Sequence, residues 1–139
     1  MKKFIIYTDG ASKGNPGPAR IGVVICDEKE RALKEYSKDI GNATNNEAEY
    51  QAVIFALKKI KALYGKKVTK EAEIEIKSDS ELLVSQLNRK YKILDPKIQK
   101  LFIQLWNLTI DFKKVIFTLI PREANKRADK LANQSPKLF

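Results

Sequence analysis

The chain has 139 residues, of which 43% are hydrophobic and 32% charged, so it is long enough for a globular domain with a substantial core. It contains no histidine and one cysteine, which excludes serine–histidine and cysteine–histidine catalysis, histidine-ligated zinc and an internal disulfide. The net charge of +10 favours a polyanionic partner, and any metal site must use oxygen ligands, which suit Mg²⁺ or Mn²⁺.

We expect residues 1–139 to form a single cytoplasmic domain that is monomeric and does not associate with membranes. No apolar run approaches membrane-spanning length, and no signal peptide or lipidation motif precedes the first strand pattern. Cys26 lies in a strand-like run, so we expect a buried structural thiol, which fits a reducing compartment.

The first predicted strand is the apolar run from Phe4, which ends on Asp9 before a loop rich in glycine, asparagine and proline. Strand alternation places Asp9 on an otherwise apolar side, where a carboxylate needs compensation such as a divalent cation. The alternative is a turn or capping role, which is common for an aspartate before glycine. Residues 20–27 and 32–40 then form two further strands, joined by a polar turn into an antiparallel meander.

The next predicted element is a helix whose N-cap is Thr44. This helix is expected to run to about Tyr64 and to end at Gly65. Its apolar stripe contains Val53, Ala56, Leu57, Ile60 and Leu63. Glu49 lies on this stripe one turn earlier, so a second carboxylate faces the sheet. The alternative is that Glu49 reaches solvent at the helix end. Residues 66–70 are expected to form a solvated basic loop.

The alternating run over residues 72–78 predicts a strand that ends on Asp79, which repeats the placement of Asp9. Alternatively, Asp79 simply N-caps the short helix that follows. A further helix begins after Asp95, and its broad apolar stripe makes Trp106 a core residue rather than a platform for a ligand.

The last elements are a buried strand over residues 115–120 and a helix over 122–134, followed by a short tail over 135–139. Side chains expected to pack inward from this helix are those of Ala124, Ala128 and Leu131. Helical spacing places Arg122, Asn125 and Asp129 on an adjacent stripe.

These elements predict an α/β fold with a five-stranded mixed sheet, three antiparallel strands followed by two parallel ones, flanked by helices. Asp9 and Asp79 would lie beyond the carboxyl ends of parallel strands, where ligands gather. With Glu49 and Asp129 they form a set of four carboxylates. Such a cluster requires cations, and two hard divalent ions would make it a two-metal site for phosphoryl transfer.

The sequence resembles type 1 ribonuclease H over essentially its whole length, through the ordered motifs YTDGA with GNPG, TNNEAE, SDS and NKRADKLA. The resemblance implies endonucleolytic cleavage of the RNA strand of an RNA–DNA hybrid, leaving 5′-phosphate and 3′-hydroxyl ends. It implies two Mg²⁺ ions, with Mn²⁺ as a substitute. Asp9 would bridge both ions, Glu49 and Asp79 would hold the ion that carries the attacking water, and Asp129 would hold the leaving-group ion.

Substrate contacts are also implied by the resemblance. Asn45 and Asn46 match the pair that contacts the minor groove of the hybrid, and Asn15 and Thr44 match residues that grip a phosphate of the DNA strand. Amide groups can recognise the 2′-hydroxyl, which distinguishes RNA from DNA, without adding charge to a metal site.

Two features depart from the family pattern. Many members carry a histidine in a loop before the last carboxylate, whereas here that segment is shortened to residues 120–123 and the chain lacks histidine, which resembles the archaeal-like subgroup. Arg122 is expected over the scissile phosphate instead, with Asn125 as a further substrate contact. Glu81 stands where many relatives have glutamine.

Two other functions stay open at this point. One is a catalytically weak module of the same fold that binds hybrid or double-stranded RNA. The other is a related metal nuclease that cuts double-stranded RNA or a DNA junction.

Overall fold

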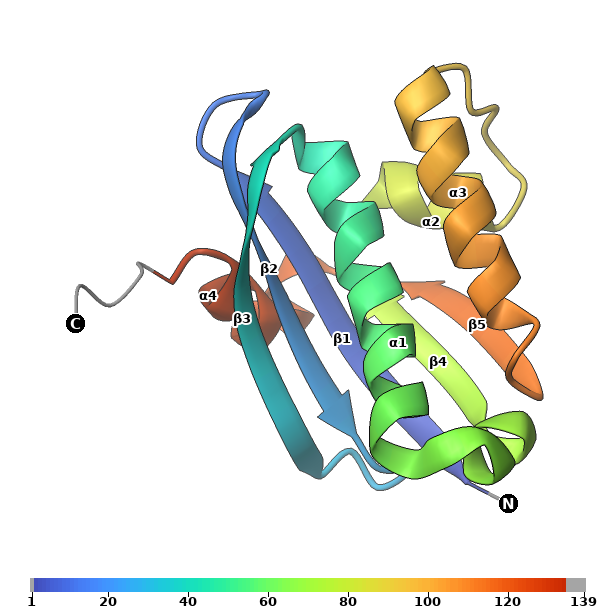
Figure 1. Ribbon diagram of the computed structural model, residues 1–139. Coiled ribbons are helices and arrows are strands. Elements are labelled where there is room, and N and C mark those ends of the chain that lie inside the picture. The colour runs from blue at the N-terminus through green and yellow to red at the C-terminus, as the bar shows by residue number, and fades with distance from the viewer. Residues whose placement is uncertain (1, 135–139) are drawn as a thin grey trace.

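The computed structural model describes residues 2–134 and places five strands in one sheet of order β3-β2-β1-β4-β5 (Figure 1). The strands are β1 (Lys3–Ser12), β2 (Gly17–Cys26), β3 (Ala32–Ala43), β4 (Glu73–Ser78) and β5 (Lys114–Leu119). The pairs β1–β2 and β2–β3 are antiparallel, whereas β4 is parallel to both β1 and β5. The mixed five-stranded sheet predicted from the sequence is therefore confirmed.

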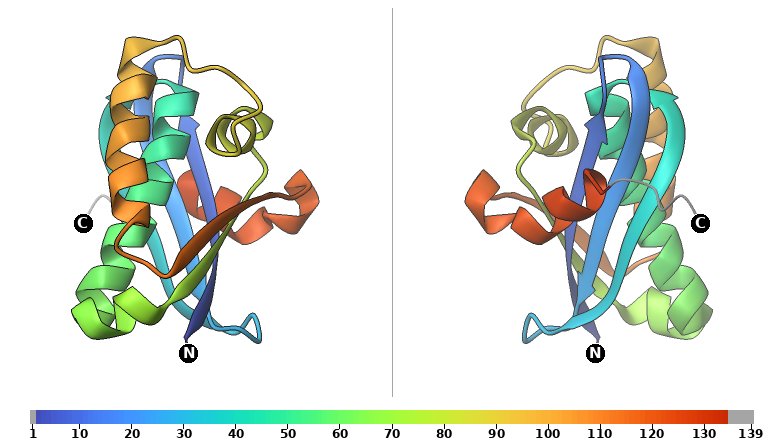
Figure 2. Two further views of the ribbon diagram at one scale, coloured as in Figure 1. Left: turned by 90° about the vertical axis from the view of Figure 1, so that its right-hand side faces the viewer. Right: turned by 90° about the vertical axis from the view of Figure 1, so that its left-hand side faces the viewer.

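Helices cover both faces of this sheet (Figure 2). They are α1 (Asn45–Glu71), α2 (Glu81–Leu87), α3 (Pro96–Thr109) and α4 (Lys126–Ala132), with a 3₁₀ turn η1 (Arg122–Ala124) before α4. The two views of Figure 2 place α1 and α3 on one face and α4 on the other. No helix within residues 2–134 combines the length and apolar character needed to cross a bilayer.

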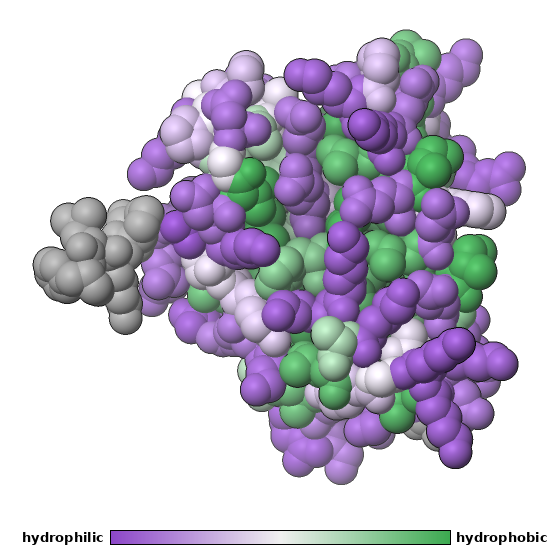
Figure 3. Space-filling view, viewed as in Figure 1, coloured by the Kyte–Doolittle hydropathy of each residue, from purple (hydrophilic) through white to green (hydrophobic). Residues whose placement is uncertain are grey.

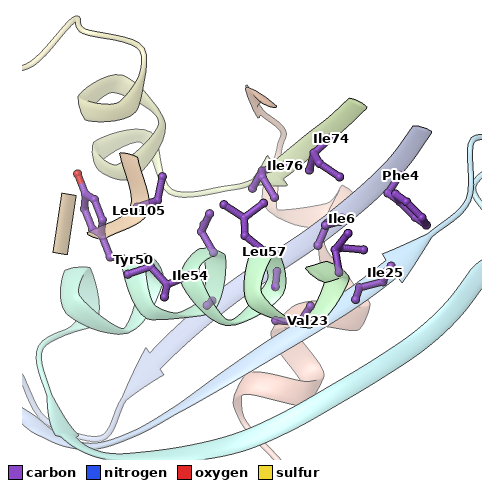
Figure 4. Packing of buried hydrophobic residues seen from close by; sticks show 14 of the residues in the cluster. Phe4, Ile6, Val23, Ile25, Tyr50, Ile54, Leu57, Ile74, Ile76 and Leu105 are labelled. Atoms are coloured by element: carbon purple, nitrogen blue, oxygen red, sulfur yellow. The ribbon is translucent and has the colours of Figure 1, made fainter. Parts of the chain in front are cut away.

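The main core lies between the sheet and α1 (Figure 4). Strand alternation directs Ile6, Ile25 and Ile76 onto this face, where they meet Leu57 of α1, and all four are essentially inaccessible to solvent. A smaller cluster on the opposite face packs Ile5, Val24 and Cys26 against Ala128 and Leu131 of α4. The thiol of Cys26 is free and buried, as predicted.

The predicted helix starts are confirmed. The hydroxyl of Thr44 accepts a hydrogen bond from the Glu47 N–H, and the Glu47 carboxylate accepts from the Thr44 N–H, which completes a capping box. At α3, the Asp95 carboxylate accepts from the Lys97 N–H, and Pro96 occupies the first turn.

The segment over residues 66–70 is helical, so its prediction as a solvated loop was wrong. Gly65 does interrupt the helix, with φ of 79°, but the chain resumes helical geometry and continues to Glu71. The hydroxyl of Thr69 donates to the Gly65 carbonyl at 2.6 Å and is buried, which anchors the second segment. A glycine break therefore produced a kink rather than a helix end.

Burial was overestimated in three places. Trp106 of α3 and Leu63 of α1 are 53% and 43% exposed, because the apolar stripe of each helix is wider than the face that packs against the rest of the protein. Strand β5 lies at the edge of the sheet and is only partly buried, not enclosed as predicted. The space-filling view accordingly shows apolar surface between the hydrophilic side chains (Figure 3).

The last helix is shorter than the predicted 122–134. Residues 122–124 form the 3₁₀ turn, Asn125 leaves helical geometry, and only Lys126–Ala132 are α-helical. Ala124 is exposed rather than packed inward, whereas Ala128 and Leu131 are buried as predicted. The predicted tail lies outside the described residues.

Candidate active site

The first two carboxylates lie where β1 and β4 separate. The last residue pair of these parallel strands is Tyr7–Lys77, and Asp9 and Asp79 each lie two residues beyond it. Beyond Asp9, strand β1 continues to Ser12 and pairs with β2 alone. The prediction that this strand ends at Asp9 was therefore wrong. Both aspartates therefore lie in the fork where β1 and β4 separate, just beyond their last parallel pair, but only Asp79 follows the end of its strand.

Glu49 reaches the same fork because α1 packs directly on the backbone of β1. A Cβ atom on Gly10 would lie 2.3 Å from the Ala48 carbonyl carbon, so only glycine permits this approach. The Gly10 N–H donates to Glu49 Oε1 at 2.7 Å, which fixes the carboxylate beside the strand. Glu49 is 9% exposed, and its predicted inward direction is confirmed.

Asp129 approaches from the other face of the sheet. The β2 residue paired with Asp9 is Gly22, and a Cβ atom there would lie 2.2 Å from the Ala128 carbonyl oxygen. The missing side chain lets α4 rest on β2 beside Asp9. Two glycines, Gly10 and Gly22, thus admit one helix to each face of β1 and β2 and bring both helix-borne acids to Asp9.

All four carboxylates line one cavity of about 520 Å³. Ligand oxygens of Asp9, Glu49 and Asp79 lie within 4.8 Å of one another, which is a spacing that metal ions can bridge. Asp129 lines the same cavity outside this set of three, and its charge acts directly on Asp9. The four residues singled out by the sequence are therefore brought together.

The electrostatics of this cavity are unfavourable without cations. Burial, followed by the charges of Asp79 and Asp129, raises the pKa of Asp9 from 3.8 to about 8. Burial, then the charge of Asp9, raises the pKa of Glu49 well above its ordinary value. Within residues 2–134, one ion pair involves these acids, from Arg122 Nε to Asp79 Oδ2 at 3.8 Å, and the side chain of Arg122 is 85% exposed. An all-oxygen donor set with this uncompensated charge fits hard divalent cations.

The position of Asp79 is braced by Asn125. The Asn125 side-chain N–H group donates to the Thr8 carbonyl at 2.9 Å and to Asp79 Oδ1 at 3.4 Å. Asn125 is 1% exposed, and the N–H side of its amide holds these two protein groups. This arrangement suits a residue that positions Asp79, and the substrate contact expected at Asn125 stays a prediction.

Comparison with known proteins identifies the family of this chain. The family described as "Reverse transcriptase-like" matches residues 7–135. A bifunctional protein of Mycobacterium tuberculosis is 36% identical over 134 residues, which are 96% of this chain and 35% of that protein. The ribonuclease HI of Halobacterium salinarum is 39% identical over 129 residues, 93% of this chain and 62% of that protein. The crystal structure of LC11-RNase H1 in complex with RNA/DNA hybrid has a TM-score of 0.88 at 45% identity, covering 94% of each chain.

The chain belongs to the ribonuclease H family. It spans about a third of the mycobacterial relative and less than two thirds of the halobacterial one. As a ribonuclease H, it has the family fold around the acidic fork.

The polar residues matched to substrate contacts in this ribonuclease H gather around the start of α1. Asn15 Oδ1 accepts a hydrogen bond from the Asn45 N–H at 2.9 Å, and Asn45 Oδ1 accepts from the Ser12 N–H at 3.0 Å. These bonds tie the end of β1 and the β1–β2 loop to the start of the helix, and both asparagines are exposed. The hydroxyl of Thr44 is engaged as the helix cap. The side-chain amide oxygen of Asn46, Oδ1, is buried without a hydrogen-bond partner among the described residues.

Sequence reasoning missed the glycines that position the acids. Gly10 was interpreted as a loop residue. Gly22 was assigned to an apolar strand without a role of its own. The available signal was the pairing of a glycine with a functional aspartate across two strands, which becomes visible only once the register of β1 and β2 is known.

Proposed function

We propose that this ribonuclease H hydrolyses the RNA strand of RNA–DNA hybrids and leaves 5′-phosphate and 3′-hydroxyl ends. The observation that carries the proposal is the cavity lined by Asp9, Glu49, Asp79 and Asp129, where the ion pair found among residues 2–134 joins the exposed Arg122 to Asp79. The hybrid bound in the LC11-RNase H1 structure supports the substrate, since that protein shares the fold at 45% identity.

The four carboxylates would hold two divalent ions, which we assign as Mg²⁺, with Mn²⁺ able to substitute. When bound, such ions supply an activated water as nucleophile and stabilise the departing 3′-oxygen. Asp9 lies between the acids of the two helices and would contribute to both ions. Glu49 and Asp79 would complete one set of ligands, and Asp129 would contribute to the other. Asn125 keeps Asp79 in place by holding it to the backbone of Thr8.

Recognition of the hybrid is assigned to residues around the acidic fork. Asn45 and Asn46 would contact the minor groove, where a donor or acceptor can distinguish the 2′-hydroxyl of RNA. Asn15 and Thr44 would grip a phosphate of the DNA strand. Arg122 is exposed beside Asp79 and would place its guanidinium on the scissile phosphate, where its fixed fork of donors suits phosphate oxygens.

The test is cleavage of three matched duplexes, RNA–DNA hybrid, RNA–RNA and DNA–DNA, each labelled on both strands, with Mg²⁺, Mn²⁺ or EDTA. We expect cleavage of the RNA strand of the hybrid with either metal and none with EDTA. Asp9→Asn should reduce the rate by at least about 10³-fold, in the range found for loss of a central catalytic group.

Asp111→Asn is the matched control, because Asp111 is a surface acid paired with Lys61 away from the cavity. It should cleave at the wild-type rate. If the hybrid stays intact in both metals, or if Asp9→Asn retains full activity, the proposed function is wrong. Preferential cleavage of RNA–RNA would instead assign double-stranded RNA as the substrate.

A further inference from the structure

A second, smaller cavity adjoins the acidic one and is lined by two basic side chains. It measures about 90 Å³, shares Ala11 and Asn133 with the acidic cavity, and receives Lys13 from the β1–β2 loop and Arg20 from β2. A space of this size holds several water molecules, so a compact anion such as a phosphate group can enter it. It is also lined by Ala132 at the end of α4 and by the two residues that follow it, so it lies next to the C-terminal end of α4.

Arg20 is held in place before any ligand arrives. Its Nη1 group donates to Ser37 Oγ at 3.2 Å, and the Ser37 hydroxyl in turn donates to the Leu131 carbonyl of α4 at 2.6 Å. Arginine carries five N–H donors, and within residues 2–134 this is its one side-chain hydrogen bond. A half-buried guanidinium with free donors facing a small cavity is suited to an oxyanion.

The charge balance of the small cavity also favours an anion. None of the ion pairs among the described residues involves Lys13 or Arg20. Asp39 is the one acid that lines the cavity, and its Oδ1 atom accepts a hydrogen bond from the Gly41 N–H at 2.9 Å. Two cations against one engaged carboxylate leave a net positive cavity beside a strongly negative one.

We propose that Lys13 and Arg20 bind the RNA phosphodiester next to the scissile one. The inference rests on the proposed function, because it places the scissile phosphate at the four acids. The small cavity shares Ala11 and Asn133 with the acidic one, so an anion bound there would lie beside the scissile phosphate, as the next phosphate of the same strand does. The DNA strand lies across the wide minor groove of an A-like duplex. On the same loop, Asn15 is turned the other way, toward α1, through its bond to Asn45.

The pair of cations would fix the register of the RNA strand on the acids without touching the reacting atoms. We therefore expect an effect on KM rather than on kcat. Lys13→Ala with Arg20→Ala should raise KM for hybrid about tenfold at 0.1 M salt, with kcat within about twofold of wild type. The plot of log KM against log salt should become shallower by about 1, because one phosphate contact is lost.

Three further variants test the sign, the location and the cause of the effect on KM. Asp39→Asn keeps an acceptor for the Gly41 N–H but removes the opposing charge, so it should lower KM. Lys66→Ala with Lys67→Ala removes the same number of charges from the kinked end of α1 and should leave KM within about twofold. Arg20→Lys retains the positive charge, so it tests whether charge alone keeps KM low. The melting temperature of each variant shows whether a raised KM comes from misfolding or from lost binding.

The strand is identified with neutral methylphosphonate linkages. A hybrid with one such linkage in the RNA strand beside the cleaved bond should bind wild type about tenfold more weakly and should show no further loss with the double variant. A linkage in the DNA strand should leave the effect of the double variant intact. Coupling to the DNA linkage instead, or an unchanged KM in a folded double variant, would overturn the inference. If wild type cleaves no hybrid, the proposed function fails first.

Discussion

Replacing Asp9 by asparagine is expected to stabilise the metal-free protein while it abolishes activity. The pKa of Asp9 is raised from 3.8 to about 8 in the folded state, chiefly by burial and by Asp79 and Asp129. The folded protein therefore retains a proton that the unfolded chain has lost, and its stability falls as the pH rises through this window. The full shift corresponds to an upper limit of about 6 kcal/mol at pH 8.5.

The measured increase in the free energy of unfolding on Asp9→Asn should be smaller than this limit, because neighbouring carboxyls take up protons and water relaxes around the charge. We expect at least about 2 kcal/mol, which is about 7 °C in melting temperature for a chain of this size. The assay is thermal unfolding of wild type and Asp9→Asn in EDTA between pH 5 and 8.5. The difference should shrink toward pH 5, where the wild-type carboxyl is protonated.

Saturating Mg²⁺ should raise the melting temperature of wild type more than that of Asp9→Asn, because the bound ions supply the positive charge that the four carboxylates lack and the variant has one carboxylate fewer. Asp111→Asn serves as the control and should lose stability by less than about 1 kcal/mol, as for a surface ion pair. An Asp9→Asn variant that is less stable than wild type in EDTA at pH 8.5 would refute the electrostatic description of the site.

Three further predictions concern the same site. The half-saturating Mg²⁺ concentration should fall as the pH rises from 6 to 8.5, because the raised pKa of Asp9 means that a proton must leave first; calorimetry in two buffers should detect proton release at pH 7. Gly22→Ala should cost about 1–3 kcal/mol and lower kcat, since α4 must retreat from a Cβ atom 2.2 Å from the Ala128 carbonyl oxygen. Asn125→Ala should cost about 1–3 kcal/mol of unfolding free energy and lower kcat, since the Thr8 carbonyl loses its donor.

Each of these has a clear contrary outcome. Metal binding at pH 7 without proton release would show that the carboxyls are already ionised. A Gly22→Ala variant with unchanged melting temperature and kcat would show that α4 is free to shift. Wild-type activity in Asn125→Ala would remove the positioning role of that amide.

Local signals in the sequence were enough to predict the order of strands and helices. The alternation around Asp9 and Asp79, the capping box at Thr44 and the proline after Asp95 each specify one element by short-range chemistry. The four acids followed because strand ends and helix faces are themselves set by this periodicity.

The errors arose where tertiary packing decides. Periodicity places Trp106 on the apolar stripe of α3, but no short-range signal says that the face of α3 packed against α1 is narrower than this stripe. Strand β5 is apolar enough for a central position, yet the parallel order places it at the edge. Gly65 breaks the helix as expected, and the recovery after it depends on the buried Thr69 hydroxyl.

The convergence of acids from both faces of the sheet has a consequence for biosynthesis. A nascent chain that has formed β1, β4 and α1 carries three of the acids, but Asp129 joins them only after β5 is paired and α4 has docked on Gly22. The set of four acids is therefore complete only after the chain has been synthesised past residue 129 and α4 has packed against β2. If the proposed function is right, a translation product that ends before Asp129 should leave a hybrid uncut.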